Sequence, residues 1–381
     1  MRRINLIISS YLRFMKNTFL ALTLILTLSA TSQVTINTNL TELSRFIAGI
    51  DCQTETYQKL QEKSFYKTHR DFTSKVWKQL EDSTLDVMVK WATEKSIMED
   101  SDTLPCMYTF SGPDFLFGSR FFPKASHYVL MGLEKCGSVT EVTSLKETSV
   151  NEYLNSIESS MRYLLKAGYF VTAHMSTDFS KTVLNGNIHM MLMFMARENY
   201  SICSIDYGYM AKDSSFYITG KKPTSTSGKI NGMRVGITDS TAQQLKYVYY
   251  FSADIMDSKL KDKPEFTAFI ENMAPFNSYF KAASYVPSHK NFAIIRNLIL
   301  NNSNKILQDD TGMPLKNLDT KIYDIEMWGT YTKVISDLSW GYQPDLKKAL
   351  EASGNNKSLP FRISYNGNYD EGMMLYAKRK K

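Results

Sequence analysis

The stretch LPCMYTFSGPDFLFGSRFFPKASHYVLMGL, residues 104–133, decides the fold. Residues 104–110 are mostly apolar and predict a buried strand, and Ser-Gly-Pro-Asp at 111–114 predicts a turn. Residues 115–122 predict a short helix, and residues 127–133 predict a second strand. Two strands joined by a helix at this spacing are expected to be parallel neighbours in one sheet.

Helical and strand patterns alternate on the carboxyl-terminal side of this unit. In the segment 151–166, Ser149 and Glu152 predict a capping box, and Gly168 predicts the helix end. Further helices are expected at 188–195 and 291–300, and strands at 201–207, 233–237, 246–251, 305–308, 361–365 and 373–377. The alternation predicts an α/β fold with a mixed, partly parallel sheet and helices on both faces.

Two boundaries divide the chain before this unit. Residues 1–32 have the layout of a signal peptide, and residues 33–100 read as a helical amino-terminal segment, because Phe72, Val76 and Leu80 recur every four residues. A polar run then leads into the α/β domain, expected to span residues 101–381. We find no internal repeat in the sequence.

The first 32 residues contain four cations and no acidic residue, followed by an apolar run at 19–28. This pattern favours export, with cleavage between Ser32 and Gln33, and an extracytoplasmic (periplasmic or secreted) protein that meets a membrane only through its signal peptide. Translation could start at Met1 or Met15. The alternative is an uncleaved membrane anchor.

The net charge bears on nucleic-acid binding, and the cysteine content bears on disulfide formation. The net charge of +7 falls to +3 once the four cations of the signal segment are removed, which is too small to indicate nucleic-acid binding. An oxidising compartment would allow two disulfides, but we expect buried free thiols slightly more. The cysteines are Cys52, Cys106, Cys136 and Cys203.

Polar residues follow both strands of the 104–133 unit. Ser111, Asp114 and Glu134 fall at the carboxyl ends of these strands, where ligands bind in open α/β sheets. The nucleotide-binding pattern is incomplete, because Gly112 stands alone and Pro113 removes an amide that a phosphate would use. The alternative is structural: Asp114 caps the following helix and Glu134 pairs with a surface cation.

A second set of candidate site residues lies within residues 284–312. A Ser-His-Asp hydrolase or an oxygen-ligated cation could be built from it, although no spacing is diagnostic. The alternative is again structural, with Ser288 as a helix N-cap and Asp310 in an ordinary turn. The set comprises Ser284, His289, Arg296, Gln308, Asp309 and Asp310.

Common catalytic signatures are missing from the sequence. There is no H-E-x-x-H, Cys-x-x-Cys, G-x-S-x-G or P-loop motif, so no metal, cofactor or enzyme class is indicated. His189 and the methionines between 190 and 195 are expected to fill the core rather than bind copper.

Residues 110–115 read F-S-G-P-D-F, and residues 307–314 read L-Q-D-D-T-G-M-P. These two blocks resemble the F-S-G-P-D-F and L-Q-D-D-[ST]-G-x-P turns shared by a family of exported bacterial proteins that has no established activity. The resemblance covers most of residues 105–315 and implies a bacterial extracytoplasmic protein. Lys135-Cys136-Gly137 departs from the family pattern.

These observations lead to one structural hypothesis: the two blocks meet at one edge of the sheet and form a site. Three functions remain open. The protein could bind a small molecule, a glycan or an envelope component, or it could be a hydrolase or transferase with Asp114 or Glu134 as general base. Its many aromatic residues also allow a structural or interaction role.

Overall fold

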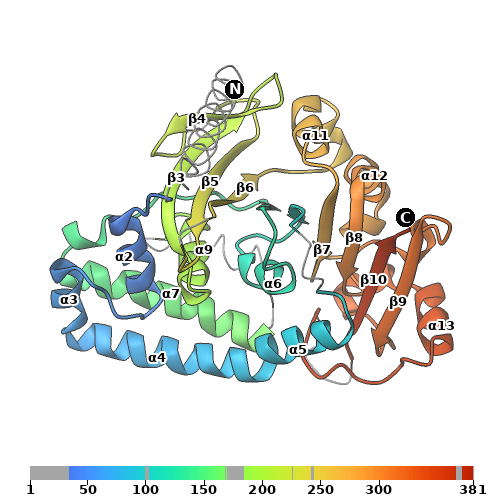
Figure 1. Cartoon of the computed structure of the whole chain (residues 1–381), viewed down its shortest axis with the longest axis horizontal. Helices are drawn as coiled ribbons and strands as arrows, with labels where there is room; N and C mark the ends of the chain where they lie inside the picture. The colour runs from blue at the N-terminus through green and yellow to red at the C-terminus, as the bar shows by residue number, and fades with distance from the viewer. Residues whose placement is uncertain are drawn as a thin grey trace, which may run out of the picture.

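A ten-stranded mixed sheet forms the centre of the protein in a computed structural model (Figure 1). The structure describes residues 34–98, 103–167, 169, 184–224, 226–241, 244–365 and 371–380. The strand order is β4-β3-β5-β6-β2-β1-β7-β8-β10-β9. The expected signal peptide and its cleavage site lie outside the described residues.

The five central strands run parallel to one another, so their carboxyl ends share one edge of the sheet. These strands are β6 (Lys246–Ser252), β2 (His127–Gly132), β1 (Cys106–Tyr108), β7 (Phe276–Phe280) and β8 (Ser303–Gln308). Antiparallel strands flank them on both sides. The flanking strands are β3 (Ser201–Met210), β4 (Phe216–Gly220), β5 (Asn231–Thr238), β9 (Tyr323–Gly329) and β10 (Met373–Arg379). The predicted parallel pairing of the 104–133 unit is therefore confirmed.

Side chains alternate along the strands between two apolar cores, one on each face of the sheet. In β2, Tyr128 and Leu130 belong to the first core, and Val129 and Met131 to the second. Helices that cover the first face are α2 (Thr38–Ile47), α3 (Glu55–Gln61), α4 (Ser64–Leu80), α5 (Asp86–Glu94), α6 (Phe115–Phe121), α7 (Glu147–Ala167) and α9 (Ile188–Arg197). The second face is covered by α10 (Asp257–Leu260), α11 (Pro264–Glu271), α12 (Ala293–Asn302) and α13 (Pro344–Ala352). The expected α/β class with helices on both faces is confirmed.

The amino-terminal segment is helical where it is described. A π-helical turn, Glu81–Leu85, joins α4 to α5. Phe46 of α2 and Trp77 of α4 belong to the same core as Leu130 of the sheet, so these helices complete the first face. In the part of the chain that the structure describes, no helix is both long and apolar enough to cross a membrane.

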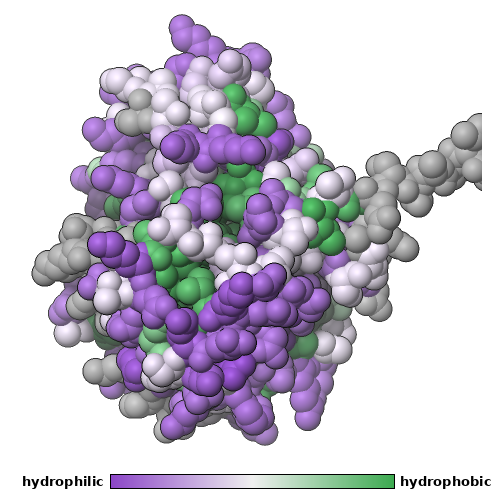
Figure 2. All heavy atoms as spheres, turned by 90° about the vertical axis from the view of Figure 1, so that its left-hand side faces the viewer, coloured by the Kyte–Doolittle hydropathy of each residue, from purple (hydrophilic) through white to green (hydrophobic). Residues whose placement is uncertain are grey.

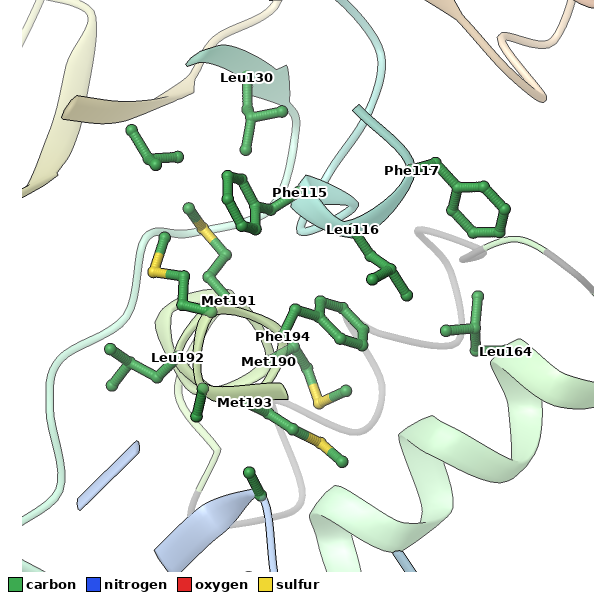
Figure 3. Packing of buried hydrophobic residues seen from close by; sticks show 14 of the residues in the cluster. Phe115, Leu116, Phe117, Leu130, Leu164, Met190, Met191, Leu192, Met193 and Phe194 are labelled. Atoms are coloured by element: carbon green, nitrogen blue, oxygen red, sulfur yellow. The ribbon is translucent and has the colours of Figure 1, made fainter. Parts of the chain in front are cut away.

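Helix α9 shows what the methionine run does (Figure 3). Met190, Met191 and Met193 point in different directions around the helix. Met190, Met191, Met193 and Met195 are all fully buried, which confirms their predicted role as core filling. His189 is buried in the same helix, where its Nδ1 lies 2.9 Å from the Tyr153 hydroxyl.

The outer face near α2 and α3 is largely hydrophilic, with apolar residues gathered in its hollows (Figure 2).

Two predictions of secondary structure were wrong, and three strands were missed. Helix α7 begins at Glu147, which suits a helix amino terminus, so Ser149 lies inside the helix and forms no cap. Residues 361–365 are buried or half-buried but form no strand. The central strand β7 and the strands β4 and β9 were missed.

Candidate functional site

A cleft of about 550 Å³ opens at the carboxyl edge of the parallel strands. The turns that follow β1, β2, β6 and β7 form its walls, together with residues 335–338, Tyr169 and Tyr365. This is the edge at which open α/β sheets bind their ligands. Because four of its walls are strand ends, the position of the cleft is fixed by the sheet itself.

Glu134 brings a buried carboxylate to this cleft. Only 5% of the residue is exposed, and it follows the end of β2. Its Oε2 accepts a hydrogen bond of 3.3 Å from the Tyr250 hydroxyl, which also donates to the Glu134 carbonyl at 2.8 Å. No cation pairs with Glu134 among the described residues. The expectation that Glu134 pairs with a surface cation was therefore wrong, because the strand end carries the side chain inward.

Two glycines make room for this carboxylate. A Cβ atom at Gly132 would lie 2.5 Å from Glu134 Oε2 and 2.8 Å from the Tyr250 hydroxyl oxygen, which is closer than non-bonded atoms approach. Gly112 faces the same carboxylate and has a φ of +55°, a conformation that favours glycine. A side chain at Gly132 would push Glu134 away from its present place, whereas at Gly112 the backbone conformation is what disfavours other residues.

The turn after β7 forms a strained wall of the cleft. Ala282, Ser284 and Tyr285 have φ angles of 50°, 51° and 54°, which non-glycine residues seldom adopt. Tyr365 holds this turn: its hydroxyl contacts the Ser284 amide at 3.0 Å and the Ser284 hydroxyl at 2.7 Å, and it donates to the Ala282 carbonyl. Strain of this kind persists where surrounding contacts impose it, and it gathers at binding sites.

Asp114 lies behind the cleft wall in a fully paired environment. Its Oδ1 accepts from the Phe117 amide at 3.4 Å, which confirms the predicted cap on α6. Its Oδ2 accepts from the Tyr108 hydroxyl at 3.0 Å and from Lys281 Nζ at 2.6 Å. Burial lowers the pKa of Lys281, and the charge of Asp114 opposes this change. Both oxygens of Asp114 are engaged, and the residue does not line the cleft.

The second sequence block meets the first through the turn after β7. Asp309 Oδ2 accepts from the Ala282 amide at 2.7 Å, next to the Lys281 that binds Asp114. Asp309 Oδ1 accepts from the amide and hydroxyl of Thr311. Burial and the neighbouring Asp310 raise the pKa of Asp309 from 3.8 to about 7. The two blocks are thus joined at one sheet edge.

The rest of the second block closes its own turn. Gln308 binds both the amide and the carbonyl of Met313, at 2.8 and 2.7 Å. Asp310 accepts from the Tyr285 hydroxyl and, at 2.7 Å, from the Ser364 hydroxyl. These polar side chains fix the loops behind the cleft and do not line it.

Of the sequence-predicted site residues, Glu134 and Ser284 line the cleft. His289 faces a separate hollow beside Trp340, so it forms no Ser-His-Asp arrangement with Ser284. Arg296 donates to the carbonyls of Pro287 and His289 at 3.0 and 3.1 Å. The buried Ser111 lies in the turn after β1 without lining the cleft.

The predicted N-cap at Ser288 was also wrong. Asp257 caps α12 instead, because its carboxylate accepts from the amides of Ala293 and Ile294 at 3.0 and 2.9 Å. The four cysteines are free thiols. Burial raises the pKa of both Cys52 and Cys136 to about 12, which makes these thiols poor nucleophiles. Within the described ranges, no group of three His, Cys, Asp or Glu residues could hold a metal ion.

Sequence reasoning missed several residues of the cleft. Asp254 could have been found, because it follows the predicted strand at 246–251 and therefore lies at the same edge. Ala282 and Ala283 follow β7, a strand that was missed. Asp337 and Tyr365 come from segments far along the chain, and no local pattern places them at the cleft.

Comparisons with models of protein families and with curated proteins find no match to this chain. The resemblance to an exported bacterial family therefore stays a prediction, and the function must be argued from the cleft.

Proposed function

We propose that the protein is an exported binding protein that holds a small organic molecule in the cleft at the carboxyl edge of its sheet. The observation that carries this proposal is the cleft itself, which has a volume of about 550 Å³ and walls made by four strand ends. Small-molecule sites in proteins are concave, mostly apolar and furnished with a few polar groups. Here Glu134 and Ser284 are such groups.

Binding without turnover agrees best with the residues around the cleft. A general base works with a nearby proton donor or acceptor, such as histidine, to complete a reaction. The described lining residues include neither histidine nor arginine, and Asp114 is occupied by Lys281. A purely structural role would not explain why the buried carboxylate of Glu134 lines the cleft.

A cavity-filling variant tests the proposal. Val286 lines the cleft and is half-buried, so Val286→Trp should occupy the space of a ligand. We expect a library of small organic fragments to raise the thermal midpoint of the wild type, and the same fragments to lose most of that effect on Val286→Trp. Ile218→Trp, on the exposed part of β4, is the matched control. Fragments that stabilise Val286→Trp as much as the wild type would contradict the proposal, as would a library without a single binder.

Export is tested separately by sequencing the amino terminus of the protein recovered from outside the cytoplasm. We expect the mature chain to begin near Gln33. A chain that keeps residues 1–32, or that never leaves the cytoplasm, would overturn this part of the proposal.

A further inference from the structure

We infer that the ligand is an organic cation with an apolar body, and that its positive charge lies against Glu134. This inference rests on the proposed binding function and names the chemical class of the ligand.

Glu134 is a buried carboxylate with too few partners. An ionised carboxylate can accept about four hydrogen bonds, and Glu134 accepts one, from Tyr250 at 3.3 Å. Its Oε1 accepts none from the described residues. Burial of a charge without a partner is unfavourable, so such groups normally pair with a cation or a set of donors. A cation in the cleft would provide the missing partner.

The buried lysine near the cleft wall pairs with Asp114 and not with Glu134. Lys281, the buried lysine nearest in sequence to the cleft wall, is 2.6 Å from Asp114 and lies over the ring of Phe117 at 3.4 Å. It therefore cannot neutralise Glu134 without breaking these contacts. The negative charge of Glu134 can therefore pair with a cationic ligand.

The other charges of the cleft have the same sign. Asp254 and Asp337 also line it, and both are exposed, which places them at its rim. The lining residues within the described ranges include no lysine, arginine or histidine. A cleft with charges of one sign attracts ligands of the opposite sign and raises their local concentration.

Aromatic rings complete the site. Phe110 and Phe292 pack edge to face with centroids 6.0 Å apart, and Tyr169 and Tyr365 do so at 4.6 Å. All four residues line the cleft. Ring faces attract ammonium groups, and they also bury apolar carbon. An alkyl- or aralkylammonium ion would thus satisfy the carboxylate and the rings together.

A matched panel of ligands tests the inference. It pairs amines from butylamine to 3-phenylpropylamine with the alcohol and the carboxylate of the same skeleton, and titrates each into the mature protein by calorimetry. We expect the best amine to bind about tenfold or more tightly than its alcohol, since a hydrogen bond to a charged group contributes that much. The carboxylates should not bind measurably. Nα-acetyl-lysine amide is added to the panel as a further ligand. Its binding relative to the simple amines shows whether the site takes a lysine side chain or a free amine.

Glu134→Gln should remove that preference, so that each amine binds no more tightly than its alcohol. Glu326→Gln, on the exposed part of β9, removes the same charge outside the cleft and should behave as the wild type. The inference fails if amines bind no better than alcohols, or if Glu134→Gln keeps the preference. In either case, alcohols that bind the wild type but not Val286→Trp would leave the proposed binding function standing. If Glu134→Gln does not fold, Asp254→Asn at the rim should still weaken amine binding relative to alcohols.

Discussion

Asp309 and Glu134 both lie just beyond the carboxyl end of a parallel strand, and both are buried, yet their surroundings differ. Asp309 accepts hydrogen bonds from Ala282 and Thr311, so both of its oxygens are paired. Glu134 has one long hydrogen bond and an open cleft beside it. Asp309 holds two loops together, whereas Glu134 faces a cavity and is the acid that we propose binds a ligand. The comparison separates structural from functional acids on one sheet edge, and four predictions test it.

The largest effect should come from removing a paired carboxylate. Asp114→Ala takes away the partner of Lys281 and the cap of α6, leaving a buried ammonium ion without its counter-charge. We expect a loss of about 3–5 kcal/mol in the free energy of unfolding, measured by urea denaturation. A loss below that of an ordinary surface substitution would show that Lys281 finds another partner.

Removing one partner of Asp310 should cost less. Tyr285→Phe deletes the hydroxyl that donates to Asp310 and leaves the bond from Ser364 in place. We expect a loss of about 1–2 kcal/mol in the free energy of unfolding, again from urea denaturation. Tyr217→Phe, at an exposed position on β4, should cause no measurable loss.

The pH dependence of stability should reveal Asp309. Its pKa is raised from 3.8 to about 7 by burial and by Asp310, so the folded protein binds this proton more tightly than the unfolded chain does. The contribution of Asp309 to the free energy of unfolding is therefore fully present below its ordinary pKa of 3.8, and it is lost as the pH rises through 7. Lowering the pH from 7 to 6 should raise the free energy of unfolding by about 1 kcal/mol at most through this group. Asp309→Asn should lack this part of the pH dependence, and an unchanged slope would contradict the assignment.

The smallest effect on stability should come from Glu134. Glu134→Gln removes a buried charge that has no cationic partner among the described residues, so we expect the free energy of unfolding to stay within about 0.5 kcal/mol of the wild type or to rise. Chemical denaturation of the two proteins side by side measures this. A loss as large as that of Asp114→Ala would mean that Glu134 is a structural residue, and the contrast between the two acids would disappear.

Local patterns predicted the centre of the fold because its elements are short-range. The unit at 104–133 contains its own strands, turn and helix, and its cap at Asp114 needs only the amide of Phe117. Strand β7 was missed because Asn277 and Ser278 interrupt its apolar pattern. Both are fully buried, and Ser278 is paired with Ser303 of β8 at 2.8 Å, a contact that exists only in the folded sheet.

The segment 361–365 shows the opposite error. Phe361 and Ile363 alternate as in a strand, and both are buried as that pattern predicts. The alternation reports burial, however, and a strand also needs a neighbour for its backbone hydrogen bonds. For the site, sequence reasoning found the sheet edge and Glu134, but it could not distinguish Glu134 from Asp309, because the difference lies in partners contributed by distant turns.

The left-handed turn at residues 282–285 has a consequence for how fast a ligand binds. Asp309, Thr311 and Tyr365 hold its backbone through hydrogen bonds made within the protein itself. Ordering a loop on binding slows association and weakens affinity. This wall is rigid in advance, so the rate of ligand capture should depend on encounter and on removal of water from the acidic cleft, and should fall as salt screens its field.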